Sequence, residues 1–172
     1  MSQSIVVLAV PHQLQGPGFL GYVDDPSYAR LVEDLIADGV DFVFEEAAGR
    51  GPSTAKNLAI LLLGPGRYLD VDPPPHERHK YGIGNTGGGD WINPGVSSDY
   101  YESAIVEENG KREKLWTQRV QDQTFKSGLA ICGICHGLSF AFRLVSAGID
   151  VEKSYSYTPF NKLCTRPHGF ST

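Results

Sequence analysis

Histidine and glutamate side chains directly follow several apolar runs in this 172-residue sequence. His12 follows the first apolar run, Glu45 and Glu46 end the second, and His136 comes three residues after a later run. Imidazole and carboxylate groups placed together suit general acid–base catalysis. These four side chains are therefore candidate catalytic residues, although the sequence leaves open which glutamate faces the site.

Arg112, Trp116 and Arg119 share one face of a long helical pattern, at i, i+4 and i+7. A guanidinium on that face could bind an anionic ligand or pair with Glu45 or Glu46. Arg112 is therefore the fifth catalytic candidate. The side chains that we expect to bind ligand are Gln13, Asp72, Arg78, Trp116 and Arg119.

Two chemistries fit these residues. If a divalent metal is present, His12, Glu46 and His136 are its expected ligands, and two imidazoles with one carboxylate suit zinc, manganese or iron. Without a metal, His12 is the expected general base, a glutamate orients it, and Arg112 stabilises the developing oxyanion.

The elements that must position these residues alternate along the chain. Strands are expected over residues 4–10, 41–46, 67–72, 128–133 and 150–157. Helices are expected over residues 26–38, 53–63, 98–124 and 138–147. This alternation predicts a single compact α/β domain over residues 1–172, with a mostly parallel sheet of about five strands and helices on both faces. The stretches 73–97 and 158–172 are expected to be irregular, and the first is rich in glycine and proline. The carboxyl ends of parallel strands share one edge, so we expect the candidate residues to gather there.

The composition bounds the class of partner. The formal net charge is -5 and the pI is about 5.5, so the chain lacks the basic surface expected for binding duplex nucleic acid or an anionic membrane. No stretch reads as a signal peptide or as a membrane span. These features predict a cytoplasmic protein, and the arginines named above favour a small anionic or polar ligand. Its oligomeric state is left open.

Cys132, Cys135 and His136 match the C-x-x-C-H pattern of covalent haem attachment. The chain carries no export signal, and its one methionine is Met1, which leaves no methionine for an axial ligand. Cys132 lies inside an apolar strand pattern, where a free cysteine usually packs as a small hydrophobe. We therefore expect neither covalent haem nor dithiol redox chemistry.

The chain resembles the erythromycin-esterase/ChaN-like/TraB-Tiki superfamily in four ordered segments spread between residues 4 and 157. These are a His motif after the first strand (10–13), an acidic pair after the second (45–46), an Arg-bearing helix (112–119) and Gly-x-x-His after a later strand (133–136). The first motif departs from the family pattern, because Ala9 stands where the family has glycine. The resemblance implies an EreA/ChaN-like site, while ester hydrolysis, metal-dependent proteolysis and haem binding all occur among such proteins.

Three functions follow as hypotheses. The first is a small hydrolase, with or without a metal. The second is a non-catalytic module that binds an anionic metabolite or nucleotide through arginines and aromatic rings. Its expected residues are Arg78, Arg112, Arg119, Tyr81, Trp91 and Trp116. The third is a carrier of haem or another metabolite through His12 or His136.

Overall fold

The structure, a computed structural model, describes residues 3–84, 98–158 and 161–164. In this part of the chain six strands form one sheet in the order β3-β2-β4-β1-β5-β6, with β6 antiparallel to β5 and the other pairs parallel. The strands are β1 Ser4–Val10, β2 Phe42–Glu45, β3 Tyr68–Asp70, β4 Ser127–Gly133, β5 Asp150–Thr158 and β6 Asn161–Cys164. The expected α/β fold is confirmed.

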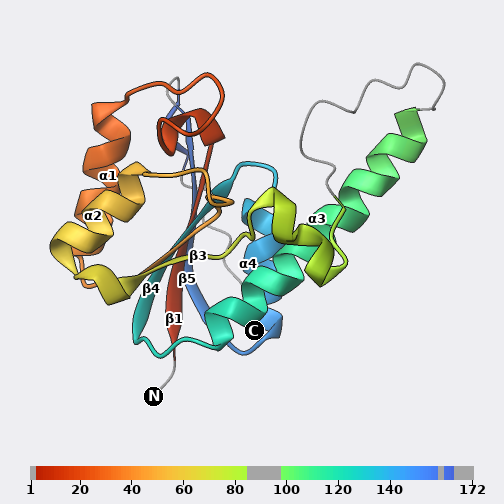
Figure 1. Ribbon diagram of the computed structural model, residues 1–172. Coiled ribbons are helices and arrows are strands. Elements are labelled where there is room, and N and C mark those ends of the chain that lie inside the picture. Colours follow the sequence, from red (N-terminus) through yellow and green to blue (C-terminus); the bar gives the residue numbers. More distant parts are fainter. Residues whose placement is uncertain (1–2, 85–97, 159–160, 165–172) are drawn as a thin grey trace.

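Four α-helices in the described chain cover the two faces of this sheet (Figure 1). They are α1 Pro26–Ala37, α2 Thr54–Leu62, α3 Ser98–Gln121 and α4 Gly137–Ser146. Asp25 and Ser53 begin α1 and α2, because each side chain accepts a backbone N–H of the first helical turn. Figure 1 shows α1 and α2 against one face, and α3 and α4 against the other.

Strand alternation divides the buried side chains into two cores. Ile5 and Val7 of β1 face α3 and α4 and join a cluster that contains Trp116. Val6 and Leu8 face α1 and α2 and join the second cluster. Both faces of β1 are therefore apolar, as its unbroken run of apolar residues predicts.

The chain passes over opposite faces of the sheet after β1 and after β4, so the direction of winding changes between these two strands (Figure 1). These strands are neighbours, yet the helix after β1 covers one face and the helix after β4 covers the other. Val10 pairs with Gly133, so the carboxyl ends of the two strands lie level. Ligands of open α/β sheets bind at such a switch point. His12 and His136 follow the two strands that form it.

Two expected irregular stretches contain regular structure. Within 158–172, Asn161–Cys164 forms β6 against the edge of β5, although four residues are too few for a periodic signal. Within 73–97, Pro75–Tyr81 forms a 3₁₀ helix, which begins after Pro73 and Pro74. Residues 85–97 lie outside the described chain. None of the described helices is both long enough and apolar enough to cross a bilayer.

Candidate functional site

His12 begins a 3₁₀ helix, His12–Leu14, directly after β1. Its Nδ1 lies 2.6 Å from Oε1 of Gln15, whose side-chain nitrogen donates to Glu45 Oε1 and to the backbone oxygen of Glu46. The two acceptors fix the amide, so Gln15 Oε1 must accept from an Nδ1–H of His12. In neutral His12 the lone pair is therefore on Nε2.

Glu45 lies on the α2 side of the sheet and holds Gln15 in place. Its carboxylate accepts from Ser53 Oγ, from Tyr68 Oη at 2.9 Å and from Gln15. Burial raises the pKa of Glu45 to about 7, against the lowering effect of the hydrogen bonds from Ser53, Tyr68 and Gln15. Glu45 therefore acts through Gln15 and does not reach the strand ends itself.

Glu46 faces the opposite side, as strand alternation predicts. Its Oε2 accepts the Gly133 N–H at 2.8 Å, and its Oε1 accepts from Nη2 of Arg112. Nε2 of His12 and Nε2 of His136 each lie 3.7 Å from that same Oε1. One carboxylate oxygen therefore stands between the two imidazoles, and Glu46 is the glutamate of the site.

Arg112 donates to the carboxylates of both Glu46 and Asp72. Asp72 lies two residues after the end of β3. Arg112 donates to Asp72 through Nε at 3.1 Å and Nη2 at 2.8 Å, which is a bidentate contact. Asp72 also accepts from Arg78 Nη2 and from Trp116 Nε1. Burial alone would raise the pKa of Asp72, but its hydrogen bond to Arg112 and the charges of Arg112 and Arg78 outweigh burial and lower it.

His136 lies at the start of α4 and is buried. Its Nδ1 lies 2.8 Å from Oε1 of Glu113, which also accepts from Ser139, while Oε2 of Glu113 accepts from Nε of Arg143. Burial acts to lower the pKa of His136, but hydrogen bonds to Cys135 and Glu113 and the charge of Glu46 raise it to about 9. This direction of shift favours the protonated form of His136 at neutral pH.

The charges in this cluster are balanced without the histidines. The carboxylates are Glu46, Asp72 and Glu113, and the guanidiniums are Arg78, Arg112 and Arg143. A protonated His136 adds one positive charge. Nη1 of Arg112 lies 3.4 Å from Nε2 of His136, so it donates to this nitrogen when the ring is neutral and faces a second donor when the ring is protonated. In the protonated state, a negatively charged oxygen that lies to one side of both nitrogens would accept from each.

Gly133 lets His12 approach the end of β4. A Cβ at this position would lie 2.6 Å from His12 Nε2 and 3.4 Å from Glu46 Oε2. Gly137 is equally confined, because its Cβ would lie 2.6 Å from Cβ of Ala9. Gly133 and Gly137, on either side of His136, therefore mark close packing of β1 against β4 and α4.

The described side chains do not fit the expected metal centre. No group of three or more His, Cys, Asp or Glu residues in the described chain could hold a metal ion. The guanidinium of Arg112 occupies Oε1 of Glu46, the oxygen nearest both imidazoles. The metal stays a prediction. Cys132 and Cys135 are free thiols, the first buried and the second exposed.

Some expected ligand-binding residues lie elsewhere. Gln13 is exposed, whereas Gln15, two residues later, is buried and belongs to the cluster. Trp116 is fully buried, so it offers no surface to a ligand. Its Nε1 donates to Asp72, and the guanidinium of Arg112 lies over its ring. Arg119 donates to the backbone oxygens of Asp70 and Val71 and stacks on Tyr81.

Two polar residues of the cluster were not expected from the sequence, and one expected residue cannot be placed. Gln15 and Glu113 each hold one of the two histidines through its Nδ1. The sequence pointed to them only through their closeness to candidate residues along the chain, since Gln15 follows His12 by three residues and Glu113 is adjacent to Arg112. Trp91 lies outside the described residues.

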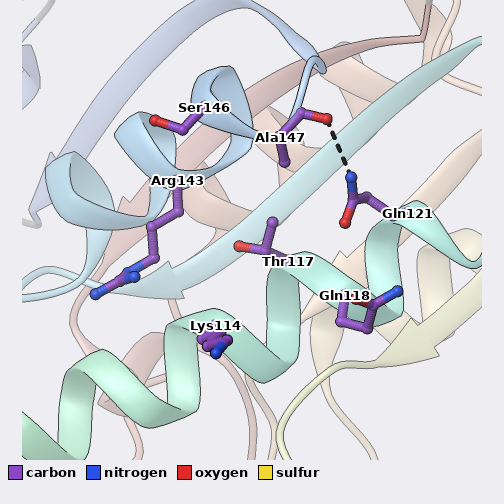
Figure 2. Close-up of a pocket in the computed structure, with 7 residues that line it drawn as sticks. All are labelled: Lys114, Thr117, Gln118, Gln121, Arg143, Ser146 and Ala147. Carbon is purple, nitrogen blue, oxygen red and sulfur yellow. Dashed lines mark hydrogen bonds between the residues drawn. The ribbon is translucent and has the colours of Figure 1, made fainter.

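A polar hollow of about 490 Å³ lies between α3 and α4 (Figure 2). Figure 2 shows Arg143 of α4 reaching toward α3, which carries Lys114 and Thr117. Gln121 closes one side by donating to the backbone oxygen of Ala147. None of the five catalytic candidates lines this hollow, and Arg143 links it to the site through Glu113.

Comparisons with known proteins add no relative. The sequence matches no family model and no curated protein, and the fold matches no solved structure. The resemblance to the erythromycin-esterase/ChaN-like/TraB-Tiki superfamily therefore stays a prediction that rests on the four motifs.

Proposed function

We propose that this chain hydrolyses a small ester or amide by metal-independent acid–base chemistry. The observation that carries the proposal is the position of two imidazole nitrogens, each 3.7 Å from Oε1 of Glu46. The proposed roles differ: His12 acts as the Nδ1–H tautomer with its lone pair at Nε2, and His136 acts with a proton on Nε2.

In the proposed reaction, Nε2 of His12 takes a proton from water, and the water oxygen attacks the carbonyl carbon. The carbonyl oxygen becomes an oxyanion and accepts from His136 Nε2–H and from Nη1 of Arg112. Glu46 stabilises the new imidazolium of His12. The intermediate then collapses, and the leaving alkoxide or amine takes the proton back from His12.

The test compares matched histidine variants on p-nitrophenyl acetate. His12→Ala should lower kcat/KM by roughly a hundredfold to ten-thousandfold, the usual contribution of a general base. His76→Ala is the control, because its side chain is 79% exposed and, among the residues that the structure describes, its ring pairs with Glu77 alone. Full activity in His12→Ala contradicts the assignment. The absence of any turnover by the wild type on a panel of p-nitrophenyl esters and anilides would contradict the proposed hydrolase activity.

The second candidate is the non-catalytic anion-binding module. The surplus charge of His136 beside the balanced carboxylate and guanidinium groups favours it. The two candidates differ in the fate of the ligand. An ester that binds and is recovered intact after long incubation with the wild type favours the module. The expectation of haem or metabolite carriage stays a prediction that a Soret band would test.

A further inference from the structure

Arg50 lies on the loop between β2 and α2, and Phe19 connects it to the proposed base. Cζ of Arg50 is 5.0 Å from the centroid of the Phe19 ring. The same ring stacks on His12, with centroids 5.5 Å apart and planes 5° from parallel. We infer that Arg50 selects substrates that carry a carboxylate or phosphate a few bonds from the scissile carbonyl. This inference rests on the proposed function.

The backbone that carries Arg50 is held in one conformation. The carboxylate of Asp70 accepts the N–H groups of Ala47, Ala48 and Gly49 at 2.7–3.1 Å. These contacts offset the left-handed conformation of Ala48, whose φ is 52°. The N–H of Arg50 then donates to the Ala47 oxygen at 3.0 Å. The guanidinium therefore extends from a fixed point of the loop.

A second loop fixes Arg50 from the other side. A Cβ at Gly18 would lie 1.7 Å from the backbone oxygen of Arg50, so the loop that carries Phe19 packs directly on the backbone of Arg50. Phe19 is only 5% exposed. The relation between the cation, the phenyl ring and the imidazole is therefore set by two loops that pack against each other.

The charge of Arg50 is available to a ligand. Arg50 is exposed and makes no ion pair with any described residue. The chain has a net charge of -5, so the charge of Arg50, which lies over the ring that stacks on His12, is opposite in sign to the overall charge. A guanidinium binds carboxylate and phosphate through paired N–H groups.

The test compares a neutral with an anionic ester of the same leaving group, p-nitrophenyl acetate and mono-p-nitrophenyl succinate. Wild type should favour the succinate ester, and Arg50→Gln should lower that preference about five- to tenfold, as expected for one partly exposed charged contact. Arg30→Gln removes the same charge from the exposed surface of α1 and should leave the preference unchanged. The inhibition constants of free succinate and inorganic phosphate show whether the site prefers a carboxylate or a phosphate.

Two outcomes overturn the inference while the proposed hydrolase stands. Arg50→Gln could lower kcat/KM for both esters equally, or it could leave both unchanged. If the wild type hydrolyses neither ester, the proposed function fails and calorimetric binding of succinate and phosphate decides. Binding that weakens in Arg50→Gln and not in Arg30→Gln supports Arg50 as the anion contact. Equal binding in both variants refutes it.

Discussion

Oε1 of Gln15 accepts a hydrogen bond from Nδ1 of His12 at 2.6 Å, and this contact decides which imidazole nitrogen faces the strand ends. Neutral histidine in water carries its proton on either nitrogen. Here the amide of Gln15 is itself fixed by Glu45 and by the backbone oxygen of Glu46. The tautomer of His12 therefore depends on a carboxylate on the far side of the sheet.

Gln15→Met should release the tautomer of His12 while keeping the volume of the side chain. We expect kcat/KM to fall at least tenfold, because a general base must present its lone pair to the water (about 1.4 kcal/mol per factor of ten). Long-range ¹H–¹⁵N NMR should find Nε2 unprotonated in neutral wild-type His12 and a tautomer mixture in the variant. Gln13→Met, on the exposed side of the same 3₁₀ helix, should change neither measurement.

Glu45 should make stability fall as the pH rises from about 4.5 to about 7. Burial raises the pKa of Glu45 in the folded state to about 7, so the folded protein holds this proton more tightly than the unfolded chain. The associated stabilisation is complete below the unfolded pKa and is lost as the pH passes 7. Its size is about 3 kcal/mol. Urea unfolding at pH 4.5, 5.5, 6.5 and 7.5 measures it.

Glu45→Gln is the matched variant, because it keeps the shape of the side chain and removes the titration. The slope of unfolding free energy against pH over this interval should be flatter than in wild type. A difference in absolute stability between Glu45→Gln and the wild type does not affect this comparison of slopes. An unchanged slope would mean that Glu45 titrates at an ordinary pH and that the hydrogen bonds to its carboxylate outweigh burial.

His136 should make stability fall over a higher pH interval. Its pKa is raised from the usual 6.5 to about 9, so the stabilisation is complete below about pH 6.5 and is lost as the pH rises through 9. Activity should fall as the pH passes the folded-state pKa of about 9, since the proposed oxyanion loses the Nε2–H. An NMR titration assigned with His136→Gln measures the pKa directly. A midpoint near 6.5 would contradict both expectations.

The sheet could be predicted from the sequence because its strands are strongly patterned. β1 and β4 are unbroken apolar runs, which are typical of strands covered on both faces. The gathering of His12, Glu46 and His136 followed from the rule that parallel strands end at one edge. Which of Glu45 and Glu46 faces the site did not follow, because it depends on which pair of helices covers which face.

The residues that hold the two histidines were harder to find. Gln15 belongs to a single 3₁₀ turn, which has no periodicity to read. Glu113 lies about 100° round α3 from Arg112, so it falls off the helix face that the i, i+4 and i+7 spacing defines. It turns toward α4 and meets His136 there. Both contacts depend on packing between elements distant in the sequence.

Arg112→Met should destabilise the fold by about 3–5 kcal/mol, because it leaves the buried carboxylates of Glu46 and Asp72 without their shared partner. Arg112→Lys keeps the charge but loses the bidentate contact, and we expect a smaller loss. Lys114→Met removes an exposed cation from the same helix and should change stability little. Equilibrium urea unfolding at pH 7 compares the three. Equal stability of Arg112→Met and wild type would mean that the two carboxylates are hydrated or protonated in the folded state.

Gly133→Ala should separate the position of His12 from the chemistry of its ring. The new Cβ would lie 2.6 Å from His12 Nε2, a distance that forces the imidazole to move, and 3.4 Å from Oε2 of Glu46. We expect kcat/KM to fall by roughly a hundredfold, since displacement of a catalytic group by an ångström is enough for such a loss. Gly66→Ala is the matched control, because a Cβ there meets no atom within 4 Å. Near-ultraviolet circular dichroism should confirm that both variants are folded. A folded Gly133→Ala variant with full activity would mean that the reaction does not need Nε2 of His12 where the structure places it.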